Sequence, residues 1–216
     1  PNASLLQLTQ TINGNEYRFR KNSAYFEQSA IWNSWLKFPV DYENEVVISD
    51  SRSRNKDIKS FESDVNLSIS EICRVLKDGG YFSLTFHSLS GLEWKSVTNA
   101  CILNNFILIE YSWLEQKTYP PRQLNRLKSI KGDVLVTFQK KISSKKPAVC
   151  DSDKLVLYVV DLIRKEIKSG ASRTNEIMMS VMECVLRNML IIGDVDVFCV
   201  LSDNFVIDKY GKWCEK

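Results

Sequence analysis

The stretch from Ser70 to Ser88, SEICRVLKDGGYFSLTFHS, constrains the fold more than any other part of the chain. Three apolar residues of its first half recur at helical spacing: Ile72, Val75 and Leu76. The pair Gly79–Gly80 can end a helix, because glycine tolerates positive φ. Residues 81–86 then alternate and cluster apolar side chains as a sheet strand does. The stretch therefore predicts a helix, a tight turn and a buried strand that ends beside His87, the only histidine.

Length and composition are those of an ordinary globular protein. A chain of 216 residues can form one core, or one core with a small satellite domain. Its 29 basic and 26 acidic residues neither demand nor exclude a nucleic-acid partner. No apolar run is long enough to span a membrane and no signal peptide opens the chain, so we expect no membrane association.

The six cysteines are widely scattered, and none forms a CxxC pair. With a single histidine they make no zinc-binding pattern, so we predict no metal site. Cysteine is often buried, and this spacing is not that of a disulfide framework. We therefore interpret the cysteines as buried, reduced thiols of a cytoplasmic protein.

The chain divides into three parts. Residues 1–142 form an α/β region, whose continuous unit begins near residue 61. A lysine-rich segment, KKISSKKP, is typical of a linker, which we assign to residues 143–150. Residues 151–216 follow as a helical C-terminal module, which we expect to act as a stabilising appendage.

Within the α/β unit, residues 91–104 have the apolar spacing of a helix. Residues 106–111 and 131–140 read as strands, and the loop at residues 116–123 connects them. We expect these two strands to pair. The unit is thus predicted to end as strand, helix, strand, loop and strand.

The C-terminal module is predicted to hold helices over residues 154–168 and 174–189. The second helix would be N-capped near Ser172 or Thr174, with Glu176 following. We interpret all four methionines as core side chains rather than ligands: Met178, Met179, Met182 and Met189. A short strand after a turn is expected within residues 203–210.

An aromatic stretch at residues 25–36, YFEQSAIWNSWL, precedes the α/β unit. It has helical spacing at Phe26, Ser29, Ala30, Asn33 and Leu36, with Trp32 and Trp35 on flanking positions. We interpret it as an aromatic helix packed in the core. The basic loop that follows contains Arg52, Arg54 and Lys56, and is either a solvated surface or a contact for phosphate groups.

The order of these blocks resembles that of a known family. Residues 22–142 are similar to the second half of DNA methylases of the N4-cytosine/N6-adenine type, which are class I enzymes that use S-adenosylmethionine. In many of them a catalytic Asp-Pro-Pro-Tyr motif precedes a segment similar to residues 22–36. A helix with E-x-x-R-V-L-K-x-G-G, like residues 71–80, and a strand ending like Phe86–His87 follow. Their sheet closes with an antiparallel hairpin.

The resemblance implies a Rossmann-like class I methyltransferase fold with a partial sheet, and S-adenosylmethionine-dependent methylation of adenine N6 or cytosine N4 in DNA. It also implies a place in restriction-modification. The implied pocket for the methyl donor or a flipped-out base is lined by Tyr25, Phe26 and His87. The implied DNA-binding residues are Arg52, Arg54, Lys56, Lys117 and Arg122.

Two motifs of the family are absent from this sequence, so no catalytic residue is assigned. Where Asp-Pro-Pro-Tyr would precede Asn22, the chain has YRFRK, and its cationic side chains cannot accept hydrogen bonds from an amino group. The glycine-rich loop that approaches the methyl donor is also missing. The chain is then a C-terminal piece of an enzyme, a chain lacking a segment before Asn22, or an inactive module that binds DNA. In each case a second methyltransferase chain or an N-terminal portion is an expected partner.

Overall fold

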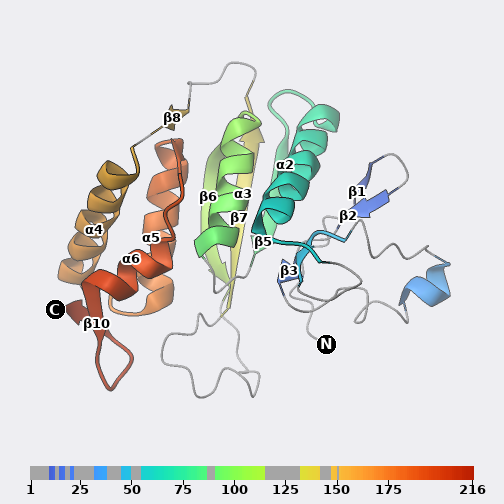
Figure 1. Cartoon of the computed structure of the whole chain (residues 1–216). Helices are drawn as coiled ribbons and strands as arrows, with labels where there is room; N and C mark the ends of the chain where they lie inside the picture. Colours follow the sequence, from blue (N-terminus) through green and yellow to red (C-terminus); the bar gives the residue numbers. More distant parts are fainter. Residues whose placement is uncertain are drawn as a thin grey trace.

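The computed structural model describes residues 10–12, 15–17, 20–21, 32–37, 45–49, 55–86, 91–114, 132–141, 147–149 and 151–216. Its architecture is mixed α/β, with helices beside a small central sheet (Figure 1). Four short strands occur early in the chain: β1 (Gln10–Ile12), β2 (Asn15–Tyr17), β3 (Arg20–Lys21) and β4 (Val47–Ile48). β1 and β2 pair antiparallel, whereas β3 and β4 pair in parallel.

α2 (Ile58–Val75) and β5 (Tyr81–Phe86) form the helix–turn–strand unit that the sequence predicts. The helix begins well before Ser70, where the stretch that predicted it starts. The Asp57 carboxylate caps its first turn by accepting a hydrogen bond from the Ser60 amide at 2.8 Å. Gly79 has a φ of +75° in the turn, a backbone conformation that favours glycine. The predicted order of helix, turn and strand is confirmed, but β5 is buried only at Leu84 and Phe86, and Tyr81 at its start is exposed.

The central sheet has the strand order β5–β7–β6. β6 (Phe106–Leu114) and β7 (Asp133–Lys140) are antiparallel neighbours, which confirms the predicted pairing. β7 also pairs antiparallel with β5, so β5 and β6 run in the same direction with β7 between them (Figure 1). α3 (Gly91–Leu103) connects these two parallel strands.

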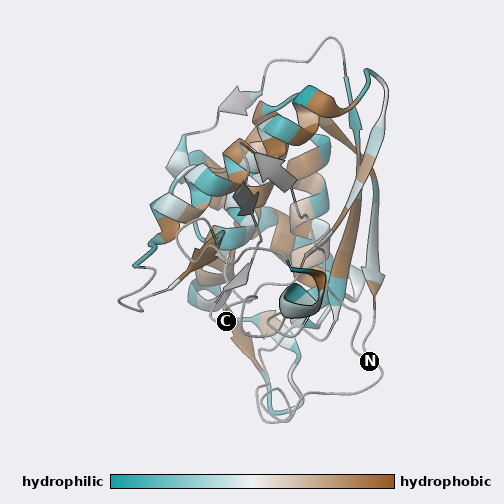
Figure 2. Cartoon of the chain, turned by 90° about the vertical axis from the view of Figure 1, so that its right-hand side faces the viewer, coloured by the Kyte–Doolittle hydropathy of each residue, from teal (hydrophilic) through white to brown (hydrophobic). Residues whose placement is uncertain are grey.

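The two faces of the sheet differ in character. One face carries buried apolar side chains toward the helices, which stand to one side of the long strands in Figure 2. They include Leu84, Phe86, Phe106, Leu108, Val136 and Phe138. The other face is more polar: Ser83 and Thr137 lie opposite each other there, and their hydroxyl oxygens are 2.9 Å apart. This pattern is typical of an antiparallel sheet with one solvated face.

The C-terminal region contains α4 (Ser152–Ser169), α5 (Thr174–Arg187) and α6 (Val197–Asn204). β8 (Ala148–Val149), in the segment assigned to the linker, pairs in parallel with β9 (Leu190–Ile191). β10 (Phe205–Ile207) and β11 (Trp213–Glu215) form an antiparallel hairpin. The buried apolar residues of this region and of the α/β unit belong to one hydrophobic cluster, so the two share a core.

The ends of the C-terminal helices agree in part with the sequence prediction. α4 ends at Gly170, whose φ is +107°. The N-cap of α5 is Arg173 rather than Ser172 or Thr174, because the Glu176 carboxylate accepts hydrogen bonds from the amides of Ser172 and Arg173 at 2.9 and 3.0 Å. The methionines pack in the core, as predicted: Met178, Met182 and Met189 are buried and Met179 is partly buried against them.

α3 is tied to the C-terminal region by polar contacts. The side-chain amide of Asn99 donates to the Ile192 carbonyl at 2.7 Å and accepts from the Ile192 amide at 2.9 Å. Lys95 forms ion pairs with Glu62 of α2 at 3.1 Å and with Asp194 at 3.3 Å. The Asn99 side chain therefore satisfies both backbone polar groups of Ile192 and ties α3 to the segment that follows β9.

Substitution of Asn99 tests this connection. Asn99→Ala leaves the amide and carbonyl of Ile192 without their partner, and we expect a loss of about 1–3 kcal/mol in the free energy of unfolding. Urea denaturation followed by circular dichroism measures it. Asn188→Ala is a matched control, since that exposed amide bonds only within the end of its own helix, to Cys184. Equal small losses in the two variants would contradict a structural role for Asn99.

Candidate functional site

The candidate site lies at the edge of the sheet where the parallel strands end. In open α/β sheets, ligands bind beyond the carboxyl ends of the parallel strands. β5 ends at Phe86 and β6 ends at Leu114, and their partners in β7 are Val134 and Asp133 respectively. These two strand ends therefore lie at one edge, on either side of the start of β7. We call it the carboxyl edge.

Two buried carboxylates belong to elements that begin at the carboxyl edge. Asp133, the first residue of β7, is 7% exposed, and Glu93 in the first turn of α3 is 2% exposed. Both residues are engaged in interactions within the protein. A negative charge in the first turn of a helix is favoured by the helix dipole. Carboxylates at such positions accept hydrogen bonds from amino groups.

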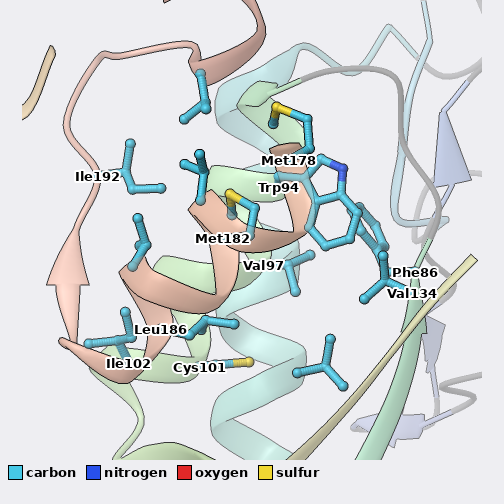
Figure 3. Packing of buried hydrophobic residues seen from close by; sticks show 14 of the residues in the cluster. Phe86, Trp94, Val97, Cys101, Ile102, Val134, Met178, Met182, Leu186 and Ile192 are labelled. Atoms are coloured by element: carbon cyan, nitrogen blue, oxygen red, sulfur yellow. The ribbon is translucent and has the colours of Figure 1, made fainter. Parts of the chain in front are cut away.

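An aromatic contact supports this edge from within the core. The rings of Phe86 and Trp94 meet edge to face, with centroids 4.7 Å apart and planes at 89°. Figure 3 shows Val134 on the side of Phe86 and Met178 on the other side of Trp94. The last residue of β5 is therefore held by α3 and the C-terminal helices, which gives the carboxyl edge a rigid base.

The residues assigned to the site from sequence fall mostly outside the described part of the chain. This is so for Tyr25, Phe26, His87, Arg52, Arg54, Lys117 and Arg122. Phe86, the described residue before His87, ends β5 at the carboxyl edge.

Lys56 is described, and its ammonium group lies 2.8 Å from the Asp64 carboxylate of α2. Its side chain is 14% exposed, and its backbone pairs with that of Ser49. Lys56 therefore has a structural partner within the protein, the carboxylate of Asp64.

Sequence reasoning missed several buried polar residues: Asn33, Glu45, Glu93, Lys95 and Asp133. Two of them had a usable signal. Glu93 stands at the start of a helix that follows a buried strand, and Asp133 follows the glycine that opens β7. Asn33 shares the helical spacing of residues 25–36, but its polar side chain gave no reason to single it out, and nothing in the pattern marks Glu45 as buried.

The cysteines that the structure describes are free thiols, but their burial differs from the prediction. Cys101 is buried, whereas Cys199 is exposed and Cys73, Cys184 and Cys214 are intermediate. Burial raises the pKa of the Cys101 thiol, which keeps it protonated and unreactive. A hydrogen bond between Tyr158 and Cys184 raises the pKa of Tyr158 to about 12.

Within the described residues, no group of three or more His, Cys, Asp or Glu side chains is arranged to hold a metal ion. The helices of that part of the chain also include none with the length and apolar character needed to cross a bilayer.

The aromatic segment at residues 32–37 presents a second candidate surface. Residues 32–36 are helical, but the prediction that the aromatic residues pack in the core is wrong for Trp32 and Trp35. Trp32, Trp35 and Leu36 are 60%, 70% and 59% exposed, while Asn33 is 6% exposed. The short helix thus turns Asn33 inward and its apolar residues outward. We call Trp32, Trp35 and Leu36 the indole surface.

No family model matches the chain, and neither a curated protein nor a solved structure matches it. The function is therefore inferred from the motifs of the sequence and the geometry of the fold.

Gly132 offers a test of the geometry at the carboxyl edge. Its φ is +126°, and a Cβ there would collide with the Leu114 carbonyl oxygen and lie 2.7 Å from the Trp113 ring. We expect Gly132→Ala to lower the free energy of unfolding by about 1–3 kcal/mol or more. Gly170→Ala is the control, because Gly170 has a φ of +107° but no atom near its Cβ position. A smaller loss for Gly132→Ala than for Gly170→Ala would contradict the close packing.

Proposed function

We propose that the chain is the C-terminal part of an S-adenosylmethionine-dependent DNA methyltransferase that modifies adenine N6 or cytosine N4. The observation that carries the proposal is the order of elements from α2 to β7. A helix with the E-x-x-R-V-L-K-x-G-G pattern leads into β5, α3 leads into the parallel strand β6, and β7 returns antiparallel to β6. This is the order and the antiparallel closure that the family resemblance implies.

The carboxyl edge supplies groups suited to holding an amino-bearing base. Transfer to an exocyclic amine requires an extruded base and acceptors for its amino protons. Glu93 and Asp133 are buried at this edge and already have partners within the protein, so we assign them to positioning the residues that contact the base. Their burial strengthens each hydrogen bond, because the local dielectric constant is low.

The described residues do not fit S-adenosylmethionine by themselves. The pair Gly79–Gly80 precedes β5, so it lies at the amino end of that strand, opposite the carboxyl edge. It cannot replace a glycine-rich loop at the edge where ligands bind. The methyl donor would therefore need an N-terminal portion or a partner methyltransferase chain.

The second candidate function is a methylase-like module that binds DNA or a methyltransferase partner without catalysis. It is favoured by the sequence before Asn22, where cationic residues stand in place of the Asp-Pro-Pro-Tyr motif. The two candidates share the fold and the DNA ligand, and they differ in whether a methylated base is formed.

Methyl transfer and donor binding distinguish the two candidates. The product of the full reading frame is incubated with unmethylated DNA and S-adenosylmethionine, and the nucleosides are identified by mass spectrometry. We expect N6-methyladenine or N4-methylcytosine, and neither would appear with an inactive module.

Calorimetric titration of the chain alone should give weak or no binding of S-adenosylmethionine. Micromolar affinity would reveal a donor site within these 216 residues.

DNA binding by the basic loop is tested through its salt dependence. The double variant Arg52→Ala/Arg54→Ala should lower the slope of log affinity against log salt by roughly two, because each neutralised phosphate contributes about 0.9. Fluorescence anisotropy at several salt concentrations measures the slope. Lys56→Ala is a useful comparison, since its ammonium group pairs with Asp64. An unchanged slope in the double variant would remove the loop from the DNA interface.

A further inference from the structure

The segment between β9 and α6 contacts α3 at regular intervals. We call residues 192–196 the strap; they belong to no helix or strand. Within the strap, Ile192 exchanges hydrogen bonds with the Asn99 side chain, and Asp194 pairs with Lys95. A step of two residues forward along the strap thus corresponds to a step of four residues back along α3.

A third contact continues this register at the start of the helix. Gly91 is the first residue of α3, and Asp196 is the last residue of the strap. A Cβ at Gly91 would collide with the Asp196 carboxylate and lie 2.9 Å from the amide nitrogen of Val197. The strap and the helix therefore approach each other so closely here that only glycine leaves enough space.

The spacing of the three contacts follows from the geometry of the two segments. Four residues of an α-helix rise about 6 Å, and two residues of a non-helical segment span at most about 7 Å. Positions 91, 95 and 99 also share one side of the helix, because residues four apart are neighbours on a helical surface. The strap therefore follows one side of α3 in the opposite direction to the helix.

The strap is anchored in the C-terminal region. Ile192 and Val195 are 2% and 6% exposed and belong to the hydrophobic cluster. Asp196 is the N-cap of α6, since its Oδ1 atom accepts hydrogen bonds from the amides of Phe198 and Cys199 at 2.8 and 3.2 Å. The same carboxylate thus fixes the start of α6 and lies against the start of α3.

The start of α3 is connected to the candidate site through one aromatic ring. Trp94 meets Phe86, the last residue of β5, with ring centroids 4.7 Å apart. In sequence Trp94 lies between Gly91 and Lys95, the two positions that the end of the strap contacts. A shift of α3 at these positions would move the ring that supports the carboxyl edge.

We propose that the strap is a latch through which the C-terminal region sets the position of the carboxyl edge. Asp196 is the positioning residue, because it joins the start of α6 to the start of α3. Release of this contact opens the first turns of α3 while the rest of the core stays folded, since a local opening costs less free energy than global unfolding. The inference goes beyond the proposed function and requires neither DNA nor a methyl donor.

Hydrogen exchange of the whole chain, followed by mass spectrometry, tests the latch. We expect Asp196→Ala to raise the exchange rates of amides in the first turns of α3 roughly tenfold, the effect of losing one ordinary contact. Asp196→Asn keeps the acceptor oxygen and should stay close to the parent chain. Asp57→Ala is the matched control, because it removes the equivalent cap of α2, which bonds to Ser60 and lies outside the strap.

A double-mutant cycle tests the contact between Gly91 and Asp196 directly. Gly91→Ala collides with the carboxylate in the parent chain, but this carboxylate is absent from Asp196→Ala. We therefore expect Gly91→Ala to lower the folding equilibrium constant less in the Asp196→Ala background, by a factor of about five or more. Urea denaturation followed by circular dichroism measures the four constants.

A milder variant covers the case in which Asp196→Ala fails to fold. The Asp194 side chain is fully exposed and pairs with Lys95, which keeps its ion pair with Glu62 when Asp194 is replaced. Asp194→Ala should therefore fold and raise exchange in the same turns of α3, by a smaller factor than Asp196→Ala.

The outcomes are distinct. Faster exchange in α6 without faster exchange in α3 would make Asp196 a helix cap only and would overturn the latch. Additive effects of Gly91→Ala and Asp196→Ala, or equally faster exchange throughout the chain in Asp196→Ala and Asp57→Ala, would also contradict it. Since none of these measurements uses DNA or S-adenosylmethionine, a failed latch leaves the methyltransferase proposal to be decided by the methylation assay.

Discussion

The enclosure of α3 is the constraint on which the rest of the structure depends. Nearly every residue from Gly91 to Ile102 is buried, because the sheet, α2 and the C-terminal region cover different sides of this helix. A helix that is buried all round gains its stability from all of its neighbours together. The C-terminal region is therefore part of the structure that holds β5, and with it the carboxyl edge, in position.

Burial on all sides also requires every polar group on α3 to find a partner. The Ser96 hydroxyl donates to the Leu92 carbonyl at 2.8 Å, Lys95 meets two carboxylates, and Asn99 pairs with the backbone of Ile192. Each of these contacts is directional, unlike apolar packing. The contacts of Lys95 and Asn99 leave the helix, so these two fix the rotation of α3 and the position of the segment around β9.

How much could be read from sequence varied with the kind of element. β5 and the pairing of β6 with β7 were predictable, because strong apolar alternation and glycine turns mark them. α6, β8 and β9 were not, since short elements carry little periodic signal and depend on tertiary contacts. In the candidate site, the end of β5 was expected from the strand pattern, whereas His87 lies outside the described residues. Glu93 was missed because a polar residue in a helix is normally exposed, and the sequence does not reveal what covers α3. Leu36 shares the helical spacing of its segment and Trp32 and Trp35 flank it, yet all three are exposed, which the spacing alone could not reveal.

The position of β7 between β5 and β6 has a consequence for how the chain folds. Within the described residues, both strands find their sheet partner only in β7, and Ser83 meets Thr137 across 54 positions of sequence. The bond between Asn99 and Ile192 spans 93 positions. Contacts this distant make folding slow, since the entropy of closing long loops is lost before the contacts form. During synthesis, β5, α3 and β6 leave the ribosome before β7 and the C-terminal region. Their apolar faces stay exposed for that interval, which makes the partly synthesised chain prone to aggregation.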